Sequence, residues 1–451
     1  MYKSSLALAV AMGVLAQQAG AAGFIEDSKL SLSSRTMYFN DDNREVNLPD
    51  SARGRGGDNR EVGQGFKLDY LSGFTEGTVG FGVDVQALWG IHLDGGRGRH
   101  PNSSTFFPSD TDGSSSSQWA RIGGNAKARF SKTEAHFGSA LAPNLPILVA
   151  NDGRLLPQTF EGGTITSKEI DNLTINAGQL THAMGRASSN RTGLSVNGAT
   201  ADSNKFRYGG LDWKVTPDLT LQYYYSNLED FYKQHFLGAT HVFKIADDQS
   251  FKTDLRYFDS SSDGKNGGPG AYNFNNNGGY EKNDGKVDNK TWSAMFTYTL
   301  GGHALMLGHQ QVSDDGGFVW LNQGSVTDGN GRPEGAGGAS FYLFTDSMIN
   351  QFARAGTNTT FGQYSYDFAR VGVPGLKAAI SYLRGDDIRN VSGNGTYHEW
   401  ERDARVDYVI QEGTLKGLGA SLRHGIYRGE GEAPVDKDQT RLIFNYTYNF
   451  M

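Results

Sequence analysis

The sequence of 451 residues contains no cysteine, and this absence excludes disulfide bonds and thiolate metal sites. It has only 11 prolines, and it has no continuous run of about 18 apolar residues that could cross a bilayer as a helix. The hydrophobic fraction of 37% is low for a chain with one large buried core. The net charge of −7 gives no support for a nucleic-acid partner.

Glycine and aromatic residues are abundant instead. The chain has 61 glycines, and aromatic residues make up 12% of it, which argues against a disordered polypeptide. Strands with one polar face, joined by loops rich in Gly, Asn and Asp, give this composition.

The N-terminus has the pattern of a secretory signal peptide. Lys3 precedes an apolar run from Leu6 to Leu15, and small residues at Ala21 and Ala22 follow. The run is about ten residues long and is too short to span a bilayer as a helix. We therefore predict a signal peptide at 1–22 and a single mature domain at 23–451. Export leaves two classes open, a soluble secreted or periplasmic protein and an outer-membrane barrel.

The last strand favours the barrel. One face of this segment is apolar and aromatic, and it carries Leu442, Phe444, Tyr446, Tyr448 and Phe450. The opposite face carries Arg441, Asn445, Thr447 and Asn449. Because side chains alternate between faces along a strand, lipid can contact the first face and water the second.

The same alternation recurs along the chain. The predicted strands lie at 29–40, 66–70, 81–91, 126–130, 173–179, 211–215, 219–227, 235–245, 251–258, 291–300, 303–312, 360–370, 376–383, 400–410 and 418–427. Short connectors at one rim are predicted to alternate with long loops at the other, as in outer-membrane barrels. At roughly 24 residues per strand and connection, the mature chain supplies about 18 strands. The predicted fold class is an all-β transmembrane antiparallel barrel, wide enough for an aqueous lumen.

Residues 141–168 do not have the pattern of a strand. Pro143, Pro146 and Pro157 remove ladder donors, and the segment is too apolar to lie free in water. A loop folded inward to narrow the barrel satisfies both facts. A surface loop packed on itself is the alternative.

Basic side chains gather on the predicted inner faces. Arg405, Arg423 and Arg441 come from three successive strands, and Arg35, Lys127, Arg129 and Arg256 come from earlier ones. The planar guanidinium suits carboxylates, so a column of arginines would attract carboxylates and pass them on. The alternative is that these side chains only fill space in ion pairs, since Asp403 and Asp407 flank Arg405 and Asp254 lies near Arg256.

No catalytic pattern is found. His136, His182, His241, His303 and His309 follow no metal-ligand spacing, and His424 is predicted to be an interfacial residue. We predict no enzyme activity, no metal and no cofactor.

Four motifs carry a resemblance to a known family. They are Ser72-Gly73-Phe74-Thr75-Glu76-Gly77-Thr78-Val79-Gly80-Phe81-Gly82, Arg154-Leu155-Leu156-Pro157-Gln158-Thr159, Leu228-Glu229-Asp230-Phe231-Tyr232 and Gly372-Val373-Pro374-Gly375-Leu376. With them, the whole mature chain resembles the outer-membrane porin D (OprD) family of substrate-specific channels. The resemblance implies an 18-stranded barrel, an inward-folded third loop that forms an eyelet, and a basic ladder that guides substrate carboxylates. It places Asp152, Arg154 and Lys168 in the eyelet loop and Arg129, Arg405, Arg423 and Arg441 on the ladder.

The family has two branches, one for basic amino acids and one for cyclic and aromatic carboxylates. Residues 151–154 and 187–190 are similar to the second branch. The chain departs from the usual outer-membrane pattern at Met451, because the last strand of such barrels usually ends on an aromatic residue, and this departure concerns only the assembly signal. The prediction is passive uptake of small carboxylates across the bacterial outer membrane. The expected partners are small carboxylate solutes, outer-membrane lipid and lipopolysaccharide, and the barrel-assembly machinery, with a monomer or a weakly associated trimer. The alternatives are uptake of basic amino acids or peptides, a non-selective porin, an outer-membrane enzyme, and a secreted adhesin.

Overall fold

A computed structural model describes residues 23–44, 58–95, 99–101, 104–276, 278–331, 334–431 and 434–451. These residues form a closed antiparallel barrel of 18 strands, which confirms the predicted fold class. The predicted signal peptide lies outside the described residues. Within these ranges, no helix has the length and apolar character needed to span a membrane.

The barrel strands follow one another in chain order. They are β1 (Lys29–Asn43), β2 (Asn59–Leu71), β3 (Val79–Asp94), β4 (Gln118–Phe130), β5 (Thr133–Leu141), β8 (Thr159–Ser167), β9 (Leu173–Met184), β11 (Phe206–Thr216), β12 (Leu219–Leu228), β13 (Tyr232–Ala246), β14 (Gln249–Ser262), β15 (Asp288–Leu300), β16 (His303–Val312), β17 (Asn358–Asp367), β18 (Leu376–Arg389), β19 (Thr396–Val409), β20 (Gly419–Gly429) and β21 (Lys437–Asn449). The two-residue strand β10 (Thr192–Gly193) pairs with β9. The described residues also form two 3₁₀ turns, η1 (Gly270–Tyr272) and η2 (Phe368–Val371).

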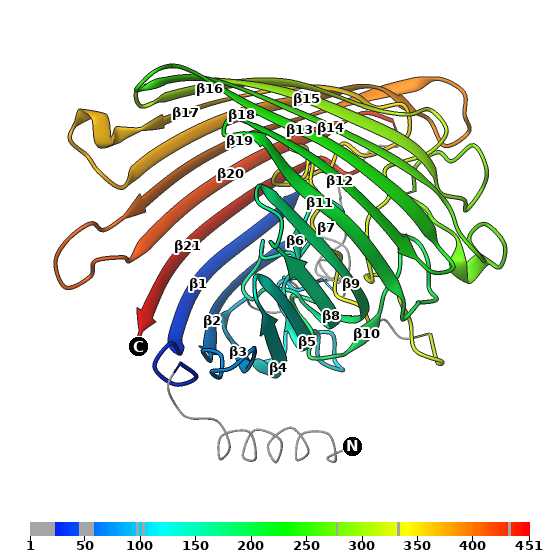
Figure 1. The fold of residues 1–451 in the computed structure, drawn as a ribbon. Helices are drawn as coiled ribbons and strands as arrows, with labels where there is room; N and C mark the ends of the chain where they lie inside the picture. The colour runs from blue at the N-terminus through cyan, green and yellow to red at the C-terminus, as the bar shows by residue number, and fades with distance from the viewer. Residues whose placement is uncertain are drawn as a thin grey trace.

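The last strand closes the ring against the first. β21 pairs antiparallel with β1 over a register that runs from Ser31–Asn449 to Asn43–Lys437 (Figure 1). Every edge is therefore paired, so the backbone leaves no open hydrogen-bonding edge toward lipid. The termini of the described chain lie at the rim of the short turns, which is the periplasmic rim in barrels of this kind.

The two faces of the strands are as predicted. On β3 the outward side chains Phe81 and Trp89 are 48% and 43% exposed, whereas the inward Asp84 and Leu88 are buried. Outward apolar side chains meet hydrocarbon and inward ones meet the lumen. His424 lies on the outward face of β20 and contacts Thr440, in agreement with an interfacial position.

Several details of the prediction are wrong. No strand was predicted at β5 or at β8, and β8 falls within residues 141–168, which were predicted to be irregular. Glycines interrupt the alternation there, at Gly138, Gly162 and Gly163. The connector after β12 is short, at residues 229–231, yet strand direction places it on the long-loop rim. The predicted strand at 360–370 ends early, because η2 begins at Phe368.

The irregular segment is therefore confined to residues 142–158. It contains the small hairpin of β6 (Asn144–Leu145) and β7 (Leu148–Val149), and it folds into the barrel, where it contacts β1. Lys168 does not belong to it. This residue lies in the turn between β8 and β9, where its backbone N–H donates to Lys132, so the prediction that Lys168 lines the eyelet is wrong.

The lumen is not polar all round. Inward side chains of β11 to β14, among them Phe206, Tyr224, Phe236 and Phe258, are fully buried. They pack against residues of the long loop between β16 and β17, such as Phe318 and Phe341. Loops therefore fill one side of the barrel with an apolar core. The polar space remains on the other side, along β1, β2 and β19 to β21.

Candidate functional site

The tip of the constriction loop, residues 142–158, is fastened to β1 by an arginine. Arg35 donates through Nη1 to Asp152 Oδ1 at 2.7 Å and through Nη2 to Asp152 Oδ2 at 3.0 Å. Nη1 also donates to the carbonyl of Arg154 at 2.7 Å, and Nε donates to Asn445 at 3.0 Å. The forked pair aligns both groups, a geometry that only arginine provides.

The underside of the same loop is apolar. Leu155 and Leu156 are buried with Met37 and Phe39 of β1 and with Phe106 and Phe107 of the loop after β3. Glycine on β2 makes this approach possible, because a Cβ at Gly63 would lie 2.8 Å from Leu155 and one at Gly65 would lie 3.0 Å from its carbonyl. The loop is thus seated by packing and not only by the ion pair.

Three arginines form a continuous row on the inner wall. Arg405 on β19 is paired in register with Arg423 on β20, and Arg423 is paired with Arg441 on β21. Like charges directly opposite each other on a sheet are destabilising, so packing alone gives no reason for this arrangement. Because barrel strands are tilted, a row across the strands runs obliquely along the pore wall.

The three members of this arginine row have different partners. Arg405 pairs with Asp407 on its own strand, and half of its side chain remains exposed. Arg423 donates to the Ser421 hydroxyl at 3.2 Å, and within the described ranges it forms no ion pair. Arg441 is buried and donates to the Met348 carbonyl at 2.6 Å, so it also holds the loop between β16 and β17.

Above the row lies a small polar cavity of about 170 Å³. Arg154, Arg186 and Arg441 line it, and Asp346 is the acidic residue that the described lining contains. Burial, with a further contribution from neighbouring Arg154, lowers the pKa of Arg186 to about 9. Burial also lowers the pKa of Arg154 and raises that of Asp346. Three guanidinium groups around one carboxylate leave this cavity with an excess of positive charge.

The remaining predicted basic residues lie elsewhere on the inner wall. Lys127 donates to Asp84 and to the Ser72 carbonyl, both at 2.7 Å, and its side chain is buried. Arg129 stacks on Phe74 at 4.3 Å near the periplasmic turn. Arg256 is clamped by Asp254 and stacks on Tyr342 at 3.6 Å. Lys127 and Arg256 therefore match the space-filling alternative, whereas Arg129 lies near the periplasmic mouth.

Two arginines near the constriction loop were not predicted. Arg186 lies two residues after the end of β9 and donates to Asn151 at 3.1 Å. Arg121 on β4 is buried and donates to the backbone carbonyls of Pro157, Gly185 and Ser188. Arg121 is two residues after Trp119 and therefore lies on the same face of β4, so the alternation of side chains could have predicted that it points into the lumen. Arg186 lies in a loop, where alternation predicts nothing.

A second loop also folds into the lumen and lines the small polar cavity. Residues 340–351 are fastened to the wall through Glu401 of β19, a fully buried carboxylate. Glu401 accepts from the backbone N–H groups of Met348 and Ile349 at 3.1 and 2.9 Å, and from that of Asn350 at 2.7 Å. The wall that carries the arginine row thus also positions this loop.

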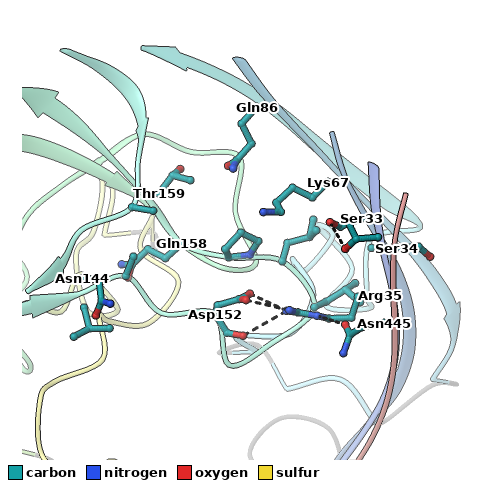
Figure 2. A pocket seen from close by; sticks show the side chains of 18 of the residues that line it. Ser33, Ser34, Arg35, Lys67, Gln86, Asn144, Asp152, Gln158, Thr159 and Asn445 are labelled. Atoms are coloured by element: carbon teal, nitrogen blue, oxygen red, sulfur yellow. Dashed lines mark hydrogen bonds and ion pairs between the residues drawn. The ribbon is translucent and has the colours of Figure 1, made fainter. Parts of the chain in front are cut away.

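Beneath the constriction loop lies a larger cavity of about 570 Å³. Its polar side chains include Arg35, Lys67, Gln86, Asp152 and Asn445, and its apolar side is formed by Leu155, Leu156 and Pro157 (Figure 2). This volume lies within the range of small-molecule sites. Among the side chains placed by the structure, no group of three or more His, Asp and Glu residues could hold a metal ion.

A closed barrel of two-faced strands, narrowed by inward loops and lined on one side by arginines, is an outer-membrane channel. The family model described as outer membrane porin, OprD family, matches residues 22–450, and the chain belongs to this family, whose members are channels and not enzymes.

Known relatives cover almost the whole chain. It is 32% identical to Porin D of Pseudomonas aeruginosa over 99% of this chain and 96% of that protein. Among solved structures, it is similar to OccK8 (OprE) of the same organism with 45% identity and a TM-score of 0.82, over 95% of this chain and 100% of the other. It is also similar to OpdK of the same organism, solved with vanillate, with 30% identity and a TM-score of 0.78, over 95% and 100% of the two chains.

Proposed function

We propose that this channel takes up small carboxylates by passive diffusion, and that cyclic or aromatic acids are its preferred substrates. The arginine row of Arg405, Arg423 and Arg441 carries the proposal. Its members face the lumen on adjacent strands, and they oppose one another at a cost in stability. A function that needs concentrated positive charge explains why such a row is kept.

Charge on the pore wall favours anions. In a confined, low-dielectric passage, fixed cations raise the local concentration of anions and lower the barrier to their entry. The cavity with Arg154, Arg186 and Arg441 extends the positive charge toward the extracellular side. A carboxylate can then pass from one guanidinium to the next without losing all of its charge partners.

An apolar surface beside a cation suits a substrate with a ring. In the cavity that contains Arg35, the partly exposed Pro143 and Pro157 of the constriction loop form such a surface. The relative OpdK was solved with vanillate, an aromatic carboxylate. These features support the preference for aromatic acids over the alternative of basic amino acids.

The test compares uptake of two matched solutes. Benzoate and benzamide have nearly the same size and differ in charge, and liposome swelling with the purified channel measures both. We expect wild type to favour benzoate, and Arg405→Gln with Arg423→Gln to lower benzoate uptake about tenfold while benzamide uptake changes little. Lys132→Gln, in an exposed periplasmic turn, is the charge-matched control. Equal uptake of both solutes by wild type would instead indicate a non-selective porin.

A further inference from the structure

We propose that the 570 Å³ cavity beneath the constriction loop is a carboxylate-binding subsite, and that an entering substrate displaces Asp152 from Arg35. The inference rests on the proposed function, because it assigns a step of carboxylate passage to particular residues. In the described structure the fork of Arg35 already holds a carboxylate, that of Asp152. The loop thus supplies an internal competitor for the substrate.

The Arg35–Asp152 ion pair is well suited to exchange. The Asp152 side chain is 53% exposed and that of Arg35 is 25% exposed, so neither group is locked away from the lumen. Water reaches both side chains, and solvent screening weakens an ion pair of this kind. A substrate carboxylate that replaces Asp152 therefore has little stabilisation to overcome.

Other contacts would keep Arg35 in position during the exchange. Its Nε donates to Asn445 at 3.0 Å and its Nη1 donates to the Arg154 carbonyl at 2.7 Å. The loop itself is also retained, because Leu155 and Leu156 stay buried against β1 and β2. Release of Asp152 therefore frees the guanidinium fork without releasing the loop.

The cavity has the remaining groups that a ring-bearing acid requires. Arg35, Lys67 and Gln86 come from the neighbouring strands β1, β2 and β3 and line the cavity, and Figure 2 shows the Asp152 carboxylate turned toward Arg35. Lys67 is held at 2.9 Å by Asp69, so a second cation lies within the site. Pro143 and Pro157, which are only partly buried, offer an apolar surface for the body of the substrate.

The experiment measures benzoate affinity with the purified channel in planar lipid bilayers, from the concentration dependence of current block. Asp152→Asn keeps the size of the side chain and removes its charge, so Arg35 loses its competitor. We expect the apparent Kd for benzoate to fall about threefold to fivefold, with benzamide unchanged. In an Arg35→Gln background, Asp152→Asn should give no such gain. Asp171→Asn, the same change in a periplasmic turn, is the matched control.

Three results would overturn the inference. In the first, Asp152→Asn changes the open-channel conductance in KCl and changes the affinities for benzamide and benzoate alike. The Arg35–Asp152 ion pair then only positions the constriction loop. If Asp152→Asn leaves benzoate affinity unchanged while Arg405→Gln still weakens it, the subsite is wrong and the proposed function stands. Failure of both substitutions to change benzoate affinity would refute the proposed function as well.

Discussion

Arg423 and Arg441 lie directly opposite each other across the β20–β21 pair, both on the lumen face. Arg405 lies opposite Arg423 on the other side, so Arg423 has a like charge on each neighbouring strand. Sheet stability alone disfavours this arrangement. This arrangement is the basis of the proposed role of the arginine row in carboxylate transport.

Removal of the central arginine should separate stability from transport. We expect Arg423→Gln to raise the free energy of unfolding of the barrel by about 0.5 kcal/mol, because the repulsion of Arg423 by Arg405 and by Arg441 disappears. The same substitution should lower benzoate uptake. The heat-induced mobility shift of the folded barrel on gels measures the first effect. A less stable Arg423→Gln barrel would show that Arg423 has a structural partner that the account omits.

Loss of the Glu401 carboxylate should loosen the loop at 340–351. A glutamine offers one acceptor oxygen where the carboxylate receives three backbone N–H groups, and each buried donor left unpaired costs about 1 to 3 kcal/mol. We expect Glu401→Gln to increase open-channel current noise in single-channel recordings. Glu134→Gln, on the lumen face of β5, is the matched control. Identical noise in both variants would argue against the anchor.

The pair of Lys127 and Asp84 should matter for folding and not for transport. Both side chains are buried, so Lys127→Met leaves Asp84 with only His136, 3.5 Å away, as a partner and should cost up to about 3 kcal/mol. Addition of Asp84→Asn should recover part of this loss. Urea unfolding in lipid vesicles measures both variants. A double variant no more stable than Lys127→Met would contradict this explanation, as would a large fall in benzoate uptake by the folded single variant.

The contact between the extracellular loop that carries Glu281 and the one that carries Gly317 should weaken as pH rises. Burial raises the pKa of Glu281 to about 8 from an ordinary value near 4.5, and its carboxylate accepts from the Gly317 N–H at 3.3 Å. Because the folded state holds the proton more tightly than the open state, the stabilisation is full below about pH 4.5 and is lost as pH rises toward 8. Opening of this contact should increase by up to about tenfold per pH unit in that window.

Hydrogen exchange of residues 278–287 as a function of pH would measure this opening. Glu281→Gln should abolish the dependence on pH while the exchange of β15 stays the same. Exchange that slows as pH rises, after correction for the intrinsic rate, would contradict the assigned direction.

The sequence predicts the barrel well because the outward side chains contact lipid and are therefore apolar, in alternation with the inward ones. The alternation from β11 to β21 survives even where loops differ in length. It fails at β8, where Gly162 and Gly163 carry no side chain and the register shifts after Glu161. Strand detection by alternation needs side chains on both faces.

The site is predicted less completely, because loops set much of it. The alternation of side chains along β19, β20 and β21 predicts that the three arginines of the row face the lumen, as they do. Arg186 and Asp346 come together only when two loops that are distant in the sequence fold inward, and no pattern in the sequence around either residue predicts this. The apolar half of the lumen was missed for the same reason, since Phe236 and Phe258 are covered by a loop and not by water.

The most direct test of the central claim is the permeability ratio of benzoate to benzamide through the purified wild-type channel in liposomes. Selection by inward-facing guanidinium groups predicts a ratio well above one that falls toward one in the Arg405→Gln, Arg423→Gln variant. A ratio of one in wild type, or a high ratio that survives both substitutions, would contradict the account.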